Sequence, residues 1–465
     1  MIWDRISRAG QHRRNPIRRD PLSIGIAILI NFGPVTPWVA TLLGSAVLGA
    51  VGLGLSFLSN AIFSRPSTQS DPQQRQATIR QSIGARVRYY GRVKVGGSLW
   101  FFEARNGVLF NGITLNEGQV AGIVEYWLND QRVTIDGGGF VNEPPYAYDG
   151  DQRAAILSFK NGSPNQTQHN LLAVFPELNN LYRLRGIANI LAAFTEVPQD
   201  RISEIYPQLN PQVRVVMDAS LVKSVRSGSY VWSDCPLDAI YDFLTGVDAS
   251  PAAFARGAGF SESQIDLPSF QSMADVSDQA VPIKAGGTIK RYRLWGGYAL
   301  NEKMKDVLPR MLATCDGDLY MTSDGKIAIR GGEWIAPELT IDDTKGHIIS
   351  HEFGRGAGAL AEFNELTTTY MEPNLDYREV EAEMWVDTEN MALVGKPRTA
   401  TLDLQMVPHH AQARRLAKIH TAKSNPAWQG RIVTNFYGFN AIGERMVHVK
   451  ISALGIDDDF LIRRV

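Results

Sequence analysis

The sequence predicts a β-rich α+β protein of several domains, with an apolar helical segment near the N-terminus. The chain has 465 residues, and a prior of about 100–200 residues per domain gives two to four domains. Its 44% hydrophobic and 20% charged residues are typical of globular proteins. The 42 Gly and 23 Pro residues favour many turns and short strands over long helices.

Charge and cysteine content exclude several classes of function. The formal net charge is −1, so the whole molecule has no electrostatic attraction to nucleic acid, whose binding depends on neutralised phosphates. We therefore expect no sequence-specific nucleic-acid binding. Cys235 and Cys315 are the only cysteines, which excludes a disulfide framework and a four-thiolate metal site within one chain. We expect two buried thiols in a chain made in a reducing cytoplasm.

The N-terminal region combines a basic arm with an uncharged apolar stretch. Six arginines occur among the first twenty residues, whereas Leu22 to Phe63 contains no Lys, Arg, Asp or Glu. As a helix, the 26 residues from Trp38 to Phe63 are long enough to cross a bilayer at about 1.5 Å per residue. The stretch is broken at Gly33-Pro34 and lacks a clear cleavage site, which disfavours a signal peptide.

Small residues recur four positions apart in this stretch, a spacing that lets helix backbones approach closely. They form the sets Ala40/Gly44, Ser45/Gly49 and Ala46/Ala50/Gly54. The residues that we expect to line a lumen or to meet a membrane are Trp38, Ala40, Gly44, Gly49, Gly54, Phe57 and Phe63. A polar run from Ser64 to Gln74 is typical of a linker into the folded body.

The next region has the pattern of a β module. Val87 to Gly97 and Leu99 to Phe102 are strand-like, and the Gly96-Gly97 pair between them predicts a hairpin. Two further strands are expected at Gln119 to Leu128 and Gln131 to Ile135. Asn129-Asp130 supplies the turn between these two strands.

A helix packed on a hairpin is predicted further along. Apolar spacing predicts helices at Pro236–Leu244, at Leu267–Val276 and at Glu302–Thr314. Asp234 is expected to cap the first helix and Gly246 to end it, and Pro309 should kink the third helix. Strands at 318–321 and 326–330 flank Ser323-Asp324-Gly325, which predicts a hairpin turn.

The C-terminal region combines strands with one helix. We expect a strand at 361–370, a helix at 409–420 and strand structure from 430 to 451. The predicted divisions are residues 1–79 (basic arm, apolar helical segment and linker), 80–165 (N-terminal β domain), 166–345 (mixed α+β domain or domains) and 346–465 (C-terminal β domain).

No motif predicts catalysis, a metal or a cofactor. His351-Glu352 begins like a zincin helix, but Arg355 stands where the second histidine is required. His409, His410 and His420 lack an acidic or thiolate partner at useful spacing.

Three other patterns are equally weak. Asp457 to Asp459 lacks the spacing of a calcium loop, and Gly137 to Gly139 lacks the features of a phosphate loop and is expected to form a bend. Glu103, Glu125 and Glu352 would be the carboxylates of a glycosidase, but their spacing selects no pair.

Several blocks in order resemble a known family. The stretches Tyr90 to Gly97, Leu109 to Leu115 and Gly122 to Asp130 resemble the opening β module of phage tail-tip hub proteins, relatives of the lambda tip attachment (host specificity) protein. Later blocks similar to that family are 232–246, 265–270, 291–294 with 307–308 and 325–327, 363–377, 412–418 and the strand pair ending at 460. The resemblance covers about residues 80–465.

The resemblance implies a non-enzymatic structural subunit of the virion tail tip, built from tail-hub β modules with the helix-on-hairpin insert. It implies a homotrimer whose β domains form a ring under the tail tube, contacting the distal tail protein and enclosing the tape measure protein until genome delivery. Relatives of the lambda type continue into receptor-binding regions beyond the last hub strand. We therefore expect other tail-tip or receptor-binding subunits to recognise the host.

The apolar segment allows two roles within this interpretation, and two other classes of protein stay open. Three copies of Trp38 to Phe63 either bundle as a buried assembly helix or transiently contact the host membrane. One alternative is a membrane-anchored β-rich cellular protein with this segment as its anchor. Another is a tail-associated cell-wall hydrolase, which would need an acidic pair in a cleft.

Overall fold

The computed structural model describes residues 85–463 apart from 179–180, 247–255 and 357–362. The described residues form two compact units, a larger one of residues 85–335 and 355–427 and a smaller one of residues 336–354 and 428–463. Strands hold 41% of the described residues and helices 22%, which confirms the β-rich α+β prediction. The expected lumen or membrane residues, Trp38 to Phe63, lie outside the described residues. The predicted domain divisions stay a prediction.

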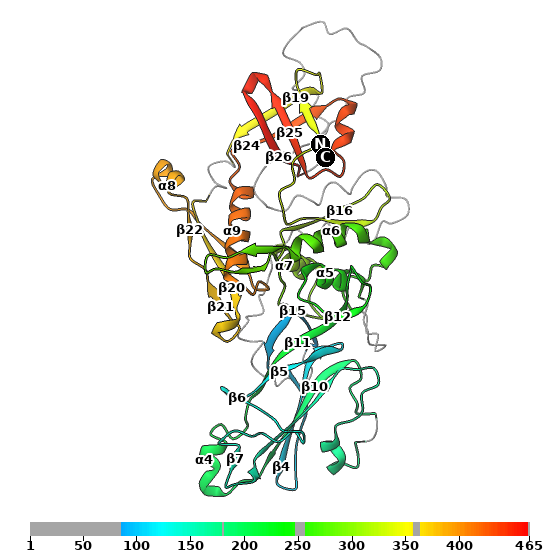
Figure 1. Ribbon diagram of the computed structural model, residues 1–465, viewed down its shortest axis with the longest axis vertical. Coiled ribbons are helices and arrows are strands. Elements are labelled where there is room, and N and C mark those ends of the chain that lie inside the picture. The colour runs from blue at the N-terminus through cyan, green and yellow to red at the C-terminus, as the bar shows by residue number, and fades with distance from the viewer. Residues whose placement is uncertain (1–84, 179–180, 247–255, 357–362, 464–465) are drawn as a thin grey trace. The chain divides into compact units, whose positions relative to one another are not determined.

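A sandwich of two sheets opens the larger unit (Figure 1). The first sheet has the order β3 (Ser98–Arg105), β4 (Val108–Glu117), β10 (Ile187–Thr195), β9 (Ala155–Asn161). The second has the order β12 (Tyr230–Trp232), β11 (Val213–Lys223), β5 (Val120–Leu128), β6 (Gln131–Val133), with β2 (Arg92–Val95) also paired to β11. Alternating apolar side chains from both sheets fill one shared core.

The predicted hairpin at Gly96-Gly97 is wrong. The first strand-like run is divided at Gly91: β1 (Val87–Tyr90) pairs with β15 (Gly296–Ala299), while β2 pairs with β11 and β3 pairs with β4. Gly97 has a φ of +63°, and a Cβ there would lie 2.1 Å from the carbonyl oxygen of Thr114. The glycine therefore permits a close backbone approach where the chain changes sheets. The Asn129-Asp130 turn between β5 and β6 is confirmed.

Three helices and a hairpin form a second core, as predicted. They are α5 (Pro236–Thr245), α6 (Leu267–Asp278), α7 (Met304–Ala313), β16 (Gly317–Met321) and β17 (Ile327–Gly331). Gly246 ends α5 in the left-handed conformation, with its N–H donating to the Asp242 carbonyl at 2.7 Å. The predicted Asp234 cap is wrong, because the N-cap residue is Cys235 and Asp234 forms ion pairs instead. Pro309 lies within α7.

The larger unit also contains a sheet that is covered by α9 (His410–Ser424). In this sheet β20 (Glu365–Glu372) pairs in parallel with β23 (Thr399–Leu404) and antiparallel with β21 (Arg378–Glu381) and β22 (Trp385–Val386). Figure 1 shows α9, in orange, beside this sheet. The predicted strand and helix are both confirmed.

The smaller unit combines a three-stranded sheet with a strand pair. The sheet has the order β18 (Thr340–Asp342), β25 (Met446–Ile451), β26 (Ile456–Leu461), and β19 (Ile348–Arg355) pairs with β24 (Trp428–Thr434). The 3-10 helix η6 (Phe436–Ala441) separates β24 from β25. The expected strand structure from 430 to 451 is therefore present at both ends of that range, and between them Asn435 caps a helical turn.

Short elements complete the chain. They are β7 (Ala147–Tyr148), β8 (Gln152–Arg153), η2 (Asn170–Val174), η3 (Gln199–Arg201), α4 (Ile202–Ile205), η4 (Glu262–Gln264), β13 (Ala280–Pro282), β14 (Thr288–Lys290), η5 (Pro373–Leu375), α8 (Thr388–Val394) and η7 (Ser452–Leu454). Among the helices of the described residues, none has the length and apolar character needed to span a membrane.

The crossing at Gly97 provides a first prediction. Gly97→Ala should destabilise the protein by clearly more than Gly150→Ala, because a Cβ at Gly97 meets the Thr114 carbonyl whereas nothing lies within 4 Å at Gly150. Both glycines have positive φ, so Gly150→Ala should cost only the left-handed strain of about 1 kcal/mol. Urea unfolding of both variants measures the difference, and equal losses would contradict the proposed close approach.

Candidate functional site

A buried ion pair joins the first strand to helix α5. Arg88 on β1 donates from Nε and Nη2 to the carboxylate of Asp242 at 2.7 and 2.8 Å. Its Nη1 donates to the backbone carbonyl of Glu117 at 2.8 Å, and the Tyr90 hydroxyl donates to Asp242 at 2.8 Å. The Arg88 and Asp242 side chains are 0% and 1% exposed. Burial raises the pKa of Tyr90, so its hydroxyl stays a donor.

Strand β1 lies between two cores, and the ion pair belongs to only one side of it. Tyr89 packs into the sandwich core, whereas Tyr90 packs into the core that contains α5, α6 and α7. Successive side chains of a strand point to opposite faces, so Arg88 shares a face with Tyr90. The Arg88–Asp242 pair therefore fixes the orientation of β1 between the sandwich and the helical core.

A strained turn attaches the β20 sheet to the sandwich. Asp376 and Tyr377 both have positive φ, at 62° and 56°, a conformation that surrounding contacts must stabilise. Asp376 forms an ion pair with Lys94, whose Nζ lies 3.4 Å from the centre of the Trp127 ring. Tyr377 stacks on Trp295 at 6.3 Å. These contacts hold the turn in place, although burial lowers the pKa of Lys94.

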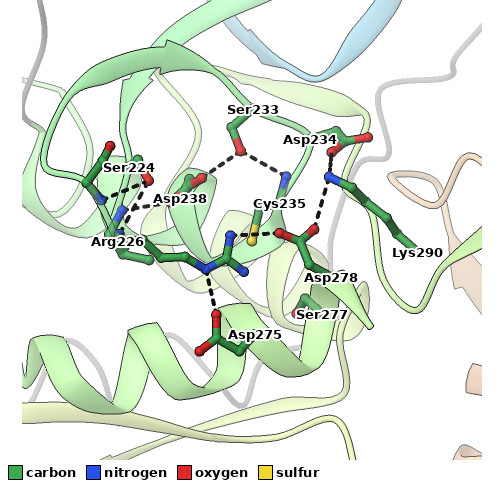
Figure 2. A network of polar contacts seen from close by, with 12 residues as sticks. Ser224, Arg226, Ser233, Asp234, Cys235, Asp238, Asp275, Ser277, Asp278 and Lys290 are labelled. Carbon is green, nitrogen blue, oxygen red and sulfur yellow. Dashed lines mark hydrogen bonds and ion pairs between the residues drawn. The ribbon is translucent and has the colours of Figure 1, made fainter. Parts of the chain in front are cut away.

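A second polar network holds the β11–β12 turn against the helices (Figure 2). Arg226 forms ion pairs with Asp275 at 2.8 Å and Asp278 at 2.7 Å, both on α6. Lys290 on β14 lies between Asp278 at 3.0 Å and Asp234 at 3.1 Å. Asp234 also pairs with Arg293 at 3.3 Å.

The ion pairs of this network all join residues of the same chain. Three cations, Arg226, Lys290 and Arg293, face the three carboxylates of Asp234, Asp275 and Asp278. Cys235 stands next to Asp234, but burial raises the pKa of its thiol to about 12. It is therefore not a thiolate nucleophile at neutral pH, and the network serves to position elements.

Ser158, His169 and Asn189 form an arrangement that resembles a catalytic triad. His169 Nε2 lies 2.7 Å from Asn189 Oδ1, and His169 Nδ1 lies 2.8 Å from the Ser158 hydroxyl. A serine nucleophile would need a basic imidazole, but burial lowers the pKa of His169 to about 4. The histidine instead attaches the segment before η2 to strands β9 and β10, where Leu172 and Phe175 cover the outer face of the sheet.

The residues that the sequence singled out for chemistry are dispersed. Glu103 and Glu125 lie on different sheets of the sandwich, and Glu352 lies on β19 in the smaller unit. His351 also lies on β19, a strand, so no zincin helix forms. Gly137 to Gly139 form the expected bend, in which Asp136 accepts from the N–H groups of Gly138 and Phe140.

His409, His420, Asp457 and Asp459 have structural partners. His409 packs against Trp295 at 6.2 Å and His420 against Phe363 at 6.0 Å. His448 lies between Asp457 and Asp459, 2.8 Å from each. Within the described part of the chain, no three His, Cys, Asp or Glu side chains are grouped to hold a metal ion.

Two surface features are therefore the candidate binding sites. One is an open hollow of about 340 Å³ at the β3–β4 turn, lined by Arg105, Phe194, Glu196, Tyr206 and Leu209 among others. Leu209 is 76% exposed with a φ of +58°, which is unusual for a large side chain. The other feature is a line of exposed apolar side chains, Phe436, Phe439 and Ile442, on and just after η6. The sequence pattern does not reveal this line, because the residues lie in a strand-like run.

A chain of a solved virion structure shares this fold, and two tail proteins give weaker matches. A chain of the virion of native gene transfer agent (GTA) particle matches with a TM-score of 0.54 and 13% identity, over 90% of this chain and 93% of that chain. The tail protein from Neisseria meningitidis MC58 has a TM-score of 0.28, 11% identity and coverage of 81% and 89%. The 43 kDa tail protein of prophage MuSo2 from Shewanella oneidensis has a TM-score of 0.28 and 10% identity, with coverage of 81% of this chain and 92% of that chain.

No family model and no curated protein matches the chain. At these identities the first likeness shows a shared fold over most of both chains, and the lower TM-scores add nothing to that conclusion.

The Arg88–Asp242 pair provides a second prediction. Asp242→Ala should lower the free energy of unfolding by about 3–5 kcal/mol, because it leaves Arg88 buried without its counter-ion. The double variant Arg88→Met/Asp242→Leu should recover most of that loss. Glu177→Ala, which breaks the exposed pair with Arg105, is the control and should cost less than about 1 kcal/mol. A loss at Asp242 as small as the control's would contradict this role.

His169 provides a third prediction, on pH dependence. An unfolded histidine has a pKa of about 6.5 and the folded one about 4, so the unfolded state binds more protons between these values. Stability is therefore fully present above pH 6.5 and falls as the pH decreases towards 4. Between pH 7 and 5 this group should account for about 2 kcal/mol of lost stability.

Urea unfolding at both pH values should show a smaller loss for His169→Gln than for the wild type. The exposed His351→Gln is the control, and a wild-type pH dependence in His169→Gln would disprove the assignment.

Proposed function

We propose that this chain is the structural hub of a phage tail tip, located in the virion. In this proposal a homotrimer forms a ring that closes the tail tube, holds the end of the tape measure protein and takes part in opening for genome delivery. The observation that carries the proposal is the shared fold with a chain of a gene transfer agent virion over 90% of this chain.

The internal contacts support a structural role rather than an enzymatic one. The polar clusters of the larger unit hold strands and helices together, and their charges are compensated by other residues of the same chain. A ring subunit under a tail tube needs a body whose parts keep their orientation while partners bind outside. We propose that the distal tail protein, the tape measure protein and other tail-tip or receptor-binding subunits contact its outer surfaces.

The apolar N-terminal segment has a proposed role in this assembly. Three copies of Trp38 to Phe63 would meet about the threefold axis as a buried assembly bundle, with small residues such as Ala40, Gly44 and Gly49 at the contacts. Transient contact with the host membrane during opening is the second role that we propose for the same residues.

Oligomeric state provides the fourth prediction. The full-length chain purified in detergent should have a protein mass of about 154 kDa by light scattering, three times the 51.4 kDa of one chain. Electron microscopy of the same sample should show rings with threefold symmetry.

Two results would decide against the hub. A chain that stays monomeric at all concentrations and partitions with membranes would favour the membrane-anchored cellular protein. Digestion of purified cell wall by the isolated chain would favour the hydrolase.

A further inference from the structure

An apolar ridge stands on the surface of the smaller unit. We define it as Phe436, Phe439 and Ile442, which are 51%, 47% and 59% exposed. The two phenylalanines lie on η6, and Ile442 is its C-cap residue. Single exposed apolar side chains are common, but three in one line form a surface that favours a partner.

The inner face of η6 fixes the direction of the ridge. Asn435 accepts a hydrogen bond from the Tyr437 N–H at 2.8 Å and donates one to the Gly346 carbonyl at 2.9 Å. Tyr437 stacks on His347 at 3.8 Å, and Ala441 is fully buried. Because these contacts orient one face of η6 inward, the ridge faces away from the core.

The ridge has a regular spacing. Residues three apart align in a 3-10 helix, which rises about 2.0 Å per residue, so successive ridge positions lie about 6 Å apart along the axis. The ring centres of Phe436 and Phe439 are 6.1 Å apart. The full ridge, over six residues, therefore extends about 12 Å.

One segment of this chain has small residues at the matching spacing. Ala46, Ala50 and Gly54 recur every four residues in a stretch without charged residues. In an α-helix four residues rise about 6 Å and eight residues about 12 Å, and small residues leave hollows that accept larger side chains. In the helix that the sequence predicts, the three small residues would thus match the three ridge side chains in number, spacing and polarity.

We infer that the ridge docks on the Ala46–Ala50–Gly54 face of the apolar segment. Each large side chain of the ridge fills the hollow above one small residue, and the contact removes all three ridge side chains from water. The inference rests on the helix that the sequence predicts for this segment and does not depend on the proposed hub function.

The docking is compatible with self-association of the same helix. At about 100° per residue, Gly44 lies about 120° around the predicted helix from Ala50. That side stays available to other copies. The 21 residues between Phe63 and Ala85 form a connection that spans about 70 Å when fully extended.

Cysteine cross-linking of the full chain tests the inference and is the fifth prediction. Cys235 and Cys315 are buried, so engineered pairs are the accessible thiols. Under mild oxidation the pair Phe439→Cys with Ala50→Cys should form a disulfide several-fold faster than either control pair.

One control joins Ala50→Cys to Leu454→Cys, at a 41% exposed residue of the same unit. The other joins Phe439→Cys to Leu48→Cys, on the opposite side of the predicted helix. Electrophoresis distinguishes a disulfide within one chain from one between copies. Equal rates for all three pairs would overturn the inference.

A labelling experiment gives an independent result. A maleimide should react with Ala50→Cys several-fold faster when Phe436, Phe439 and Ile442 are all changed to serine, since these exposed side chains shield the helix without supporting the core. Leu454→Ser is the control and should leave the rate unchanged. If the triple-serine change leaves the labelling rate unchanged but abolishes flotation of the protein with phosphatidylglycerol-containing vesicles, the ridge binds lipid and the inference is wrong.

Discussion

The architecture of the larger unit depends on keeping one arginine charged and satisfied in a dry interior. Arg88 has no access to water, and its hydrogen bonds to Asp242 and to the Glu117 carbonyl take the place of hydration. Asp242 lies on a helix and Glu117 on the sandwich, and both must keep their positions for the pair to survive. A mispacked β1 would leave a buried charge without a partner, which costs several kcal/mol. The pair thus contributes to the uniqueness of the packing as much as to its stability.

The other polar contacts extend the same principle to the rest of the unit. The Asp376–Tyr377 turn keeps an unfavourable backbone conformation because Lys94, Trp127 and Trp295 stabilise it on the sandwich side. The Arg226 network holds the β11–β12 turn, α6 and β14 together through ion pairs. These ion pairs join elements of the same chain and so keep the orientation of those elements.

Local patterns were enough to predict elements whose contacts are local. The hairpin at Ser323 to Gly325, the helices α5, α6 and α9 and the Gly246 terminus are all set by residues within a few positions of each other. Gly96-Gly97 failed because a glycine pair serves equally in a tight turn or where two strands approach closely. Asp234 failed as a cap because Lys290 and Arg293, more than fifty positions away, offered a stronger interaction.

The buried ion pair and the apolar ridge could not be predicted for a related reason. The Arg88–Asp242 pair joins positions 154 residues apart, and the ridge is visible only when residues 436–442 are known to form a 3-10 turn rather than a strand. Alternation in a strand would have placed Phe436 and Phe439 on opposite faces. The period of three places them on the same face.

A shared fold at 13% identity constrains the interior more than the surface. Many sequences satisfy the alternating apolar pattern of a sandwich. The likeness to a virion chain therefore concerns the arrangement of the elements and not the particular side chains. It does not supply the chemistry of the outer faces, which this chain's own residues determine. The ridge on η6 is such a case, because its position follows from the fold while its partner follows from spacing and polarity. Fold and assembly are therefore separate inferences, and each depends on its own residues.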